Sequence, residues 1–489
     1  MEMEAVAQRP KLLNRTQGIV LAILAVVAIW SFGPVSPLTA VLLAVSVLLL
    51  LGLRKPVWAM AAFLVSQLTA TSYMVNTFFP AISLRLLLLI LIGFILWRYS
   101  AEKKIELGPT ARRVLIPAVI LIVVSVIANI ANTGFDYAFR DFRNMLVGLL
   151  IIIFLPAVIR NSKDLKILCG VAFIALVGSA IIGLLQHYQF FGMGQNTLIS
   201  GFLELPVEGE TRVPGMAETE LELAYALSVA FPVLLGVYLA KGMKAGTGWL
   251  LGVSAVLMVL ALYFTYTRSA LFGLILGIVA LALFFKTRIR GEIILAILLL
   301  GVGLIAATGM LGNEYLGGRS ASVQEESSVS RQILWQSGTS IAIENPVLGI
   351  GGDRYLEVSP EYASDVDPSL LAWEEETYWG YSSLGSEQPH NDFLMMWICY
   401  GTLALVAYLW LYVAVLRNLL DSYRASTTRF IKGLSIGLAA GLVVYGVNAF
   451  YHNLMITMPL FWILAGFSLA TAKLALKSRG HNRREANQS

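Results

Sequence analysis

Charged side chains are scarce in this sequence of 489 residues, since Asp, Glu, Lys and Arg make up only 13% of it. A soluble domain averages about 25% charged residues. Hydrophobic residues make up 57%, and the mean hydropathy is +0.75. The length would allow roughly three soluble domains. Because apolar runs continue from one end of the sequence to the other, we interpret residues 1–489 instead as a single transmembrane domain.

Cysteine is also scarce, and the two that occur, Cys169 and Cys399, both lie within apolar runs. Neither an external disulfide nor a cysteine-rich metal site is therefore indicated. The sequence has no CxxC pair, no HExxH and neither a Walker-type nor a dinucleotide-binding fingerprint. We predict no metal site and no cofactor, and nothing in the sequence points to nucleic acid as a partner.

The apolar runs predict the fold, because a membrane-spanning helix needs roughly 20 mostly apolar residues. The first run resembles a signal peptide, but Gly33-Pro34 leads directly into the next run and no clear cleavage site is present, so we interpret it as a helix. We expect an all-α polytopic membrane protein with about fourteen spans (about twelve to fourteen fit the runs). The predicted spans are 18–33, 37–53, 57–75, 83–98, 114–132, 145–159, 166–188, 221–240, 248–267, 269–285, 291–311, 391–416, 431–450 and 455–476.

The distribution of charge predicts the orientation, because Lys and Arg concentrate in the cytoplasmic loops of membrane proteins. With both termini cytoplasmic, 27 of the 35 basic residues fall inside, and the eight outside are all Arg. Of the 30 acids, 22 fall outside. Guanidinium is a permanently charged planar fork that matches phosphate in a bidentate way. The outer arginines are therefore candidates for binding phosphate, and the alternative is that they pair with neighbouring acids.

Two extracytoplasmic loops are long, a smaller one at 189–220 and a larger, partly helical one at 312–390. In the larger loop, Ser328 to Ile343 is predicted to be a helix that Asn345-Pro346 ends. The glycines after it, through Gly352, are expected in turns. An aromatic and acidic stretch follows, and it suits sugar binding because rings stack on sugars and carboxylates accept hydroxyl hydrogen bonds; the alternative is an interfacial aromatic belt. Its candidate sugar contacts are Trp373, Glu375 and Tyr378.

Three histidines are expected at outer helix ends, His187, His390 and His452, and position alone does not choose among them. His390 ends the larger loop and could take a proton from a sugar hydroxyl as a neutral imidazole. Asp392 or an outer glutamate is the candidate group to orient it.

The smaller loop carries Arg212, and a tight hairpin between two predicted spans carries Arg268 at its tip. An arginine in so short a connection at membrane depth is costly without an anionic partner. We therefore expect Arg268 to bind an anion.

Four segments together resemble the bacterial O-antigen polymerase/ligase family of GT-C-type membrane glycosyltransferases. Thr265-Tyr266-Thr267-Arg268-Ser269 is similar to the T-x-S-R-G segment of that family, with Thr267 and Ser269 departing from it. Arg331 and Trp335, followed by Asn345-Pro346 and Gly349-x-Gly351, resemble its R…W…PLLGIG block. His390-Asn391, which nine residues separate from Gly401, resembles its HN-x9-G signature, and Arg212-x-x-Gly215 resembles its R-x-x-G element. The resemblance covers roughly residues 205–410.

The resemblance implies a multi-pass protein of the bacterial plasma (inner) membrane whose site faces the periplasm or exterior. It implies an inverting, metal-independent transfer from an undecaprenyl-diphosphate-linked glycan to the hydroxyl of an acceptor glycan or of the lipid A core. Membrane lipid and a chain-length regulator protein are the further partners expected. By resemblance the catalytic base is His390, diphosphate ligands are Arg212 and Arg268 with Arg331 and Arg140 as secondary candidates, and further acceptor or sugar contacts are Asn391, Asp392 and Trp335.

Ala404 stands where ligases of the family have Gly, Thr or Tyr, which favours a polymerase of O-antigen or related surface polysaccharide over a ligase. A polysaccharide or lipid transporter is the alternative from another class. Transporters often place ionisable residues near the membrane midplane. The unusual residues here cluster instead at the outer ends of the predicted spans, which favours the enzyme.

Overall fold

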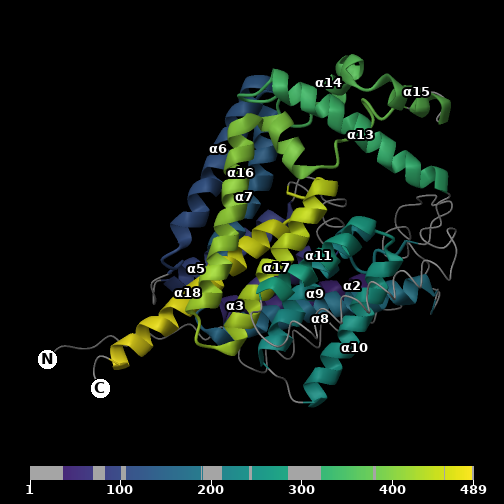
Figure 1. The fold of residues 1–489 in the computed structure, drawn as a ribbon. Helices are drawn as coiled ribbons and strands as arrows, with labels where there is room; N and C mark the ends of the chain where they lie inside the picture. The colour runs from purple at the N-terminus through teal and green to yellow at the C-terminus, as the bar shows by residue number, and fades with distance from the viewer. Residues whose placement is uncertain are drawn as a thin grey trace.

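The computed structural model describes residues 37–69, 83–100, 106–188, 190, 212–241, 245–284, 321–377, 382–455 and 458–486. Within these ranges every long element is a helix, which confirms the all-α fold (Figure 1). The elements are α2 (Pro37–Gly52), α3 (Pro56–Gln67), α5 (Leu84–Ser100), α6 (Ala111–Asn132), α7 (Phe135–Val158), α8 (Ser162–His187), α9 (Glu220–Lys241), α10 (Ala245–Phe264), α11 (Arg268–Phe284), α13 (Ala321–Glu344), α14 (Tyr355–Val358), the 3-10 helix η2 (Ser359–Asp365), α15 (Pro368–Thr377), α16 (Asp392–Ala425), α17 (Arg429–Tyr451) and α18 (Leu460–Ala486).

Twelve of the predicted spans each coincide with one of these helices, and the ranges 18–33 and 291–311 lie outside the described residues. Seven helices in the described part of the chain are long and apolar enough to cross a membrane, namely α6, α7, α8, α9, α16, α17 and α18. Five shorter apolar helices accompany them. The protein is thus a multi-pass helical membrane protein, while the count of fourteen and the cytoplasmic termini stay predictions.

Several helices are longer than the apolar runs that predicted them, and α7 and α16 are two examples. α7 begins at Phe135, ten residues before the predicted start at 145, and α16 continues to Ala425 rather than to 416. The added turns carry charged residues such as Asp141 and Arg417. A helix satisfies its own backbone hydrogen bonds whatever its side chains are, so it continues past the apolar segment by which hydropathy recognises it.

α17 packs against α9, α11, α16 and α18 and is among the most buried of the spanning helices. Gly433, Gly437 and Gly441 recur at intervals of four and therefore lie on one face of α17. A Cβ added to Gly437 would lie 2.7 Å from the Cα of Val233 on α9. Small residues at such an interface let two backbones approach closely, which is how helices associate within lipid.

α16 is broken at Gly401, whose φ of 81° lies in the left-handed region. The segment after α13 fills the break. The amide of Ile350 donates to the carbonyl of Ile398 over 2.9 Å, and the amide of Thr402 donates to that of Pro346 over 2.8 Å. The predicted turns around Gly349 are therefore confirmed, but their backbone is paired with α16 and so helps to place the first part of that helix.

α13, α14 and α15 lie together at one end of the molecule, and α18 runs toward the opposite end (Figure 1). The predicted helix from Ser328 to Ile343 is confirmed as part of α13, which ends at Glu344, directly before the predicted Asn345-Pro346 stop. The larger loop thus forms a helical cover over the end of the bundle at which His390 precedes α16.

Candidate functional site

The loop that carries His390 is tied to the segment that follows α17. Asn391 caps α16, since its side chain accepts hydrogen bonds from the amides of Phe393 and Leu394. The backbone amide of Asn391 in turn donates to the side-chain oxygen of Asn453 over 2.9 Å. The side-chain nitrogen of Asn453 donates to the side chain of Gln388 over 2.8 Å. These bonds hold the start of α16 and the segment after α17 in a fixed relation.

Asp392 reinforces the same connection from inside the protein. Its carboxylate is 1% exposed and accepts hydrogen bonds from the hydroxyls of Tyr408 and Tyr445 and from the amides of Leu454 and Met455. Buried in this way, Asp392 has no open path to a substrate. The structure therefore places it as a group that positions the backbone rather than as the predicted sugar contact or the group beside His390.

His390 is partly buried, lies just before α16 and has a φ of 51°. Left-handed conformations cost a non-glycine residue roughly 1–2 kcal/mol and persist where neighbouring contacts enforce them, often at active sites. One such contact is the indole of Trp335, which donates to the Pro389 carbonyl over 2.7 Å. Trp335, which was predicted to contact the acceptor glycan, thus touches the backbone next to His390.

Two side chains flank the His390 ring. Its Nδ1 lies 3.2 Å from the Nδ1 of His452, and its Nε2 lies 3.8 Å from a carboxylate oxygen of Glu387. Glu387 is held in place by the Ser330 hydroxyl, which donates to it over 3.2 Å. The carboxylate beside the imidazole is therefore the outer glutamate, not Asp392.

His452 and His187, the other two predicted histidines, have different surroundings. Burial lowers the pKa of His452 to about 4, and the charges of His390 and Arg331 act in the same direction. His187 stacks on Phe264 instead, with ring centroids 3.7 Å apart. The structure thus brings two of the three histidines together, which spacing in the sequence could not show.

A cavity of about 460 Å³ lies between α11, α13 and the end of α17 and brings two of the predicted arginines together. Burial lowers the pKa of Arg331, and the positive charge of Arg268 adds to that effect. The positive charges of Arg268 and Arg331 therefore repel one another. A bound anion would offset this repulsion, so the cavity suits an anion. The lining residues are Arg268, Ser269, Phe272, Ser328, Arg331, Gln332, Trp335, Phe450 and Tyr451.

Tyr225 links Arg212 to this cavity and has no counterpart in the sequence predictions. Its hydroxyl lies 3.4 Å from the hydroxyl of Ser269 and within electrostatic reach of Arg331 and Arg212. Arg212 also pairs with Glu220 at 3.1 Å. A buried tyrosine one turn after the glutamates that open α9 is the signal that could have indicated it.

The remaining predicted residues lie elsewhere or outside the described part. Arg140 pairs with Asp353 beside a buried network in which Asn129 and Tyr400 donate to Asp141. No contact in the described ranges links Arg140 with the cavity. Trp373 and the exposed Glu375 lie on α15, and Tyr378 lies outside the described residues.

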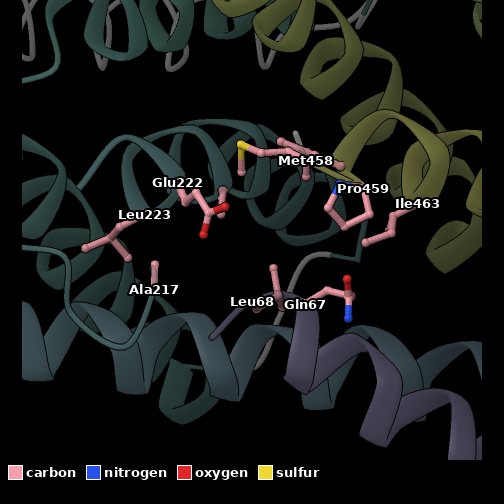
Figure 2. Close-up of a pocket in the computed structure, with 10 residues that line it drawn as sticks. Gln67, Leu68, Ala217, Glu222, Leu223, Met458, Pro459 and Ile463 are labelled. Atoms are coloured by element: carbon pink, nitrogen blue, oxygen red, sulfur yellow. The ribbon is translucent and has the colours of Figure 1, made fainter. Parts of the chain in front are cut away.

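A second, apolar cavity of about 370 Å³ lies between α3, α8, α9, α10, α17 and α18. A much smaller cavity adjoins it toward the segment after α17 and shares Leu68 and Leu460 with it. Figure 2 shows Glu222 and Met458 at this smaller cavity, with Leu68 and Gln67 across from them. The larger space is lined almost entirely by apolar side chains and so suits a hydrocarbon chain.

Fold and site together define a multi-pass helical membrane protein with a histidine and cationic site at one end of its helices. Residues 253–409 match a family model described as O-antigen ligase. This match supports membership of the O-antigen polymerase/ligase family and, in general terms, a glycosyltransferase-like enzyme of polysaccharide biosynthesis. The matched range contains Arg268, Arg331 and His390 and ends before His452. No curated protein matches the chain.

Proposed function

We propose that this protein transfers a glycan from undecaprenyl diphosphate to an acceptor sugar hydroxyl on the outer face of the bacterial inner membrane, and thereby polymerises a surface polysaccharide. The observation that carries the proposal is the cavity lined by Arg268, Arg331 and Trp335, because the Trp335 indole also bonds the Pro389 carbonyl next to His390. A proton acceptor and two permanent positive charges are the groups that this reaction requires of a protein.

In the proposed reaction the acceptor hydroxyl gives its proton to Nε2 of His390. Its oxygen attacks the anomeric carbon from the face opposite the diphosphate, so the configuration inverts. A glycosidic bond forms, the bond from the sugar to the diphosphate breaks, and the electron pair leaves with undecaprenyl diphosphate.

The arginines act on the leaving group. Arg268 and Arg331 line the cavity, and Arg212 lies within electrostatic reach of Tyr225 at its edge. Guanidinium forks match phosphate oxygens and keep their charge at any physiological pH. They can therefore stabilise the developing charge without a divalent ion, and transfer should survive exhaustive chelation. Loss of transfer that only a divalent ion restores would contradict a metal-independent reaction.

The apolar interior supports a lipid-linked donor. The cavity of about 370 Å³ has apolar walls on six helices, and burial of an isoprenoid chain against such surfaces removes it from water favourably. A lipid carrier also accounts for a charged site at the end of apolar helices. The outer-facing site and cytoplasmic termini follow from the charge distribution in the sequence.

Ligation to the lipid A core is the second candidate, because the matched family model carries that description. Purified protein with a lipid-linked oligosaccharide separates the alternatives. Long chains from donor alone indicate a polymerase, whose product lengths an added chain-length regulator would narrow, and product that requires added lipid A core indicates a ligase. Movement of intact substrate across a vesicle, without transfer, would indicate a transporter.

His390→Ala tests the mechanism in the same assay. We expect transfer to fall by about 10²- to 10⁴-fold, the usual contribution of general acid–base catalysis, in a protein that is expressed and folded. The matched control is His187→Ala, which removes another outer histidine and should retain most activity. Normal product from His390→Ala would sink the assignment of the base.

A further inference from the structure

Nδ1 of His390 and Nδ1 of His452 are 3.2 Å apart, and the two ring planes differ by 8°. An imidazole N–H lies in the plane of its ring, so near-parallel rings can join through these two atoms by one N–H···N hydrogen bond. One Nδ1 must then donate and the other accept, since a neutral imidazole has one protonated nitrogen, which donates, and one unprotonated nitrogen, which accepts. The pair therefore has two resting arrangements, which differ in the ring nitrogen that each histidine keeps protonated.

We propose that His452 is the positioning residue for His390, and that its Nδ1 accepts the Nδ1–H of His390 so that Nε2 of His390 is left as the proton-accepting atom. The inference rests on the proposed role of His390 as the base. In the opposite arrangement Nε2 of His390 already carries a hydrogen and cannot take the proton from the hydroxyl of the acceptor glycan. No proton reaches His452, because the hydroxyl proton stays on Nε2 of His390 and His390 becomes an imidazolium.

The surroundings of His452 suit an acceptor. Burial and the charge of Arg331 keep the ring neutral at pH 7, with a pKa lowered to about 4. The Tyr225 ring packs against it with centroids 5.8 Å apart. The bonds from Asn391 to Asn453 and from Leu454 and Met455 to Asp392 fix the backbone that follows it. A neutral ring held in this way has one orientation from which to accept.

A neutral acceptor also solves an electrostatic problem of this site. Serine proteases place a carboxylate behind the catalytic histidine. A carboxylate at position 452 would lie within electrostatic reach of Arg331 and would compete with a diphosphate for its charge. A second imidazole orients the first and adds no negative charge beside the anion site.

Transfer by two variants tests the pairing. His452→Phe keeps a flat ring without an acceptor, and His452→Asn places an amide oxygen near the position of Nδ1. We expect kcat to fall roughly 10- to 100-fold in the Phe variant, as for other partners that orient a functional histidine, with KM for the lipid-linked donor unchanged. The Asn variant should recover much of the loss. Should the Phe variant fail to fold, His452→Gln replaces it. The amide of Gln lies one bond farther from the backbone than that of Asn, so its oxygen does not occupy the position of Nδ1.

The dependence of kcat on pH is a second measurement, and it should not change if His452 only packs against His390. Loss of the acceptor destabilises the His390 imidazolium, so the acidic limb of kcat should move to lower pH in His452→Phe. The other groups facing the pair, Glu387, Arg331 and Tyr225, are the same in both proteins. Equal kcat and an unmoved acidic limb in the Phe variant would overturn the inference.

Nitrogen NMR of histidine-labelled protein tests the same point without an activity assay. The sequence has four histidines, so single substitutions assign each ring. We expect Nδ1 of His390 and Nε2 of His452 to be protonated, and the opposite pattern at neutral pH would overturn the inference. Full transfer by His390→Ala would instead overturn the proposed function and leave the measured protonation pattern intact, so the two failures are distinguishable.

Discussion

The indole Nε1 of Trp335 donates a hydrogen bond of 2.7 Å to the carbonyl of Pro389. Trp335 lies on α13, so this bond connects the helix that carries Arg331 with the residue before His390. Trp335 therefore connects the cavity that it lines with Arg331 to the loop that carries His390, as the Ser330–Glu387 bond also connects α13 to that loop. Contacts of this kind can hold a base and an anion site within the small tolerance that catalysis requires.

Trp335→Phe keeps the ring and removes this donor. One neutral hydrogen bond contributes about 0.5–1.5 kcal/mol, so unfolding should change by no more than that, while transfer should fall roughly tenfold because the His390 loop loses a constraint. Activity and thermal unfolding of the detergent-solubilised protein check both. Trp397→Phe is the control, because its indole bonds Thr402 within α16. An equal loss of transfer in both variants would contradict the positioning role of Trp335.

Arg268 is exposed at the start of α11 and lines the cavity with Arg331. If bidentate contact to a diphosphate is its role, Arg268→Lys should resemble Arg268→Ala, with transfer reduced at least tenfold, because an ammonium is a point charge without a planar fork. Arg354→Lys is the control, since Arg354 pairs with Glu357 on the surface. Full activity of Arg268→Lys would indicate a role for the charge alone.

Asp392→Asn removes the acceptor that four donors share. The new amide must turn one N–H toward the hydroxyls of Tyr408 and Tyr445 or toward the amides after α17. Leaving a buried donor unsatisfied costs roughly 1–3 kcal/mol, so thermal unfolding should shift clearly downward. Asp353→Asn breaks an exposed ion pair with Arg140 and should cost only about 0–1 kcal/mol. Equal shifts would show that the Asp392 network contributes nothing particular.

The sequence was sufficient for the helical class and for much of the site, and the reasons are physical. Apolar runs mark helices because lipid requires backbone hydrogen bonds to close within a segment, and twelve predicted ranges coincide with helices. Arg268 was predicted because a charge near apolar segments needs an anionic partner, and Arg331 was predicted from the family resemblance. The cavity that both line agrees with that reasoning.

Other features depend on contacts between distant segments and could not be predicted. The pairing of His390 with His452 joins positions 62 residues apart. Asp392 was expected to face a substrate because it follows His390-Asn391, but the first turn of α16 directs it inward. The break at Gly401 is another example, since a Cβ there would lie 2.2 Å from the Val347 carbonyl, a constraint set by the segment after α13.

The lowered pKa of His452 predicts how stability depends on pH. Its ordinary value is 6.5 and its value in the folded protein is about 4, so between these pH values the unfolded chain binds more protons than the folded one. Stability should then fall as pH decreases from about 6.5 to about 4, and this contribution should be constant below that range. Thermal unfolding across the range is compared between the wild type and His452→Phe, which lacks this titrating group. We expect the unfolding temperature of the wild type to fall more steeply than that of the variant. Parallel curves would mean that His452 is as easily protonated in the folded state as in the unfolded one, which would contradict the burial that lowers its pKa.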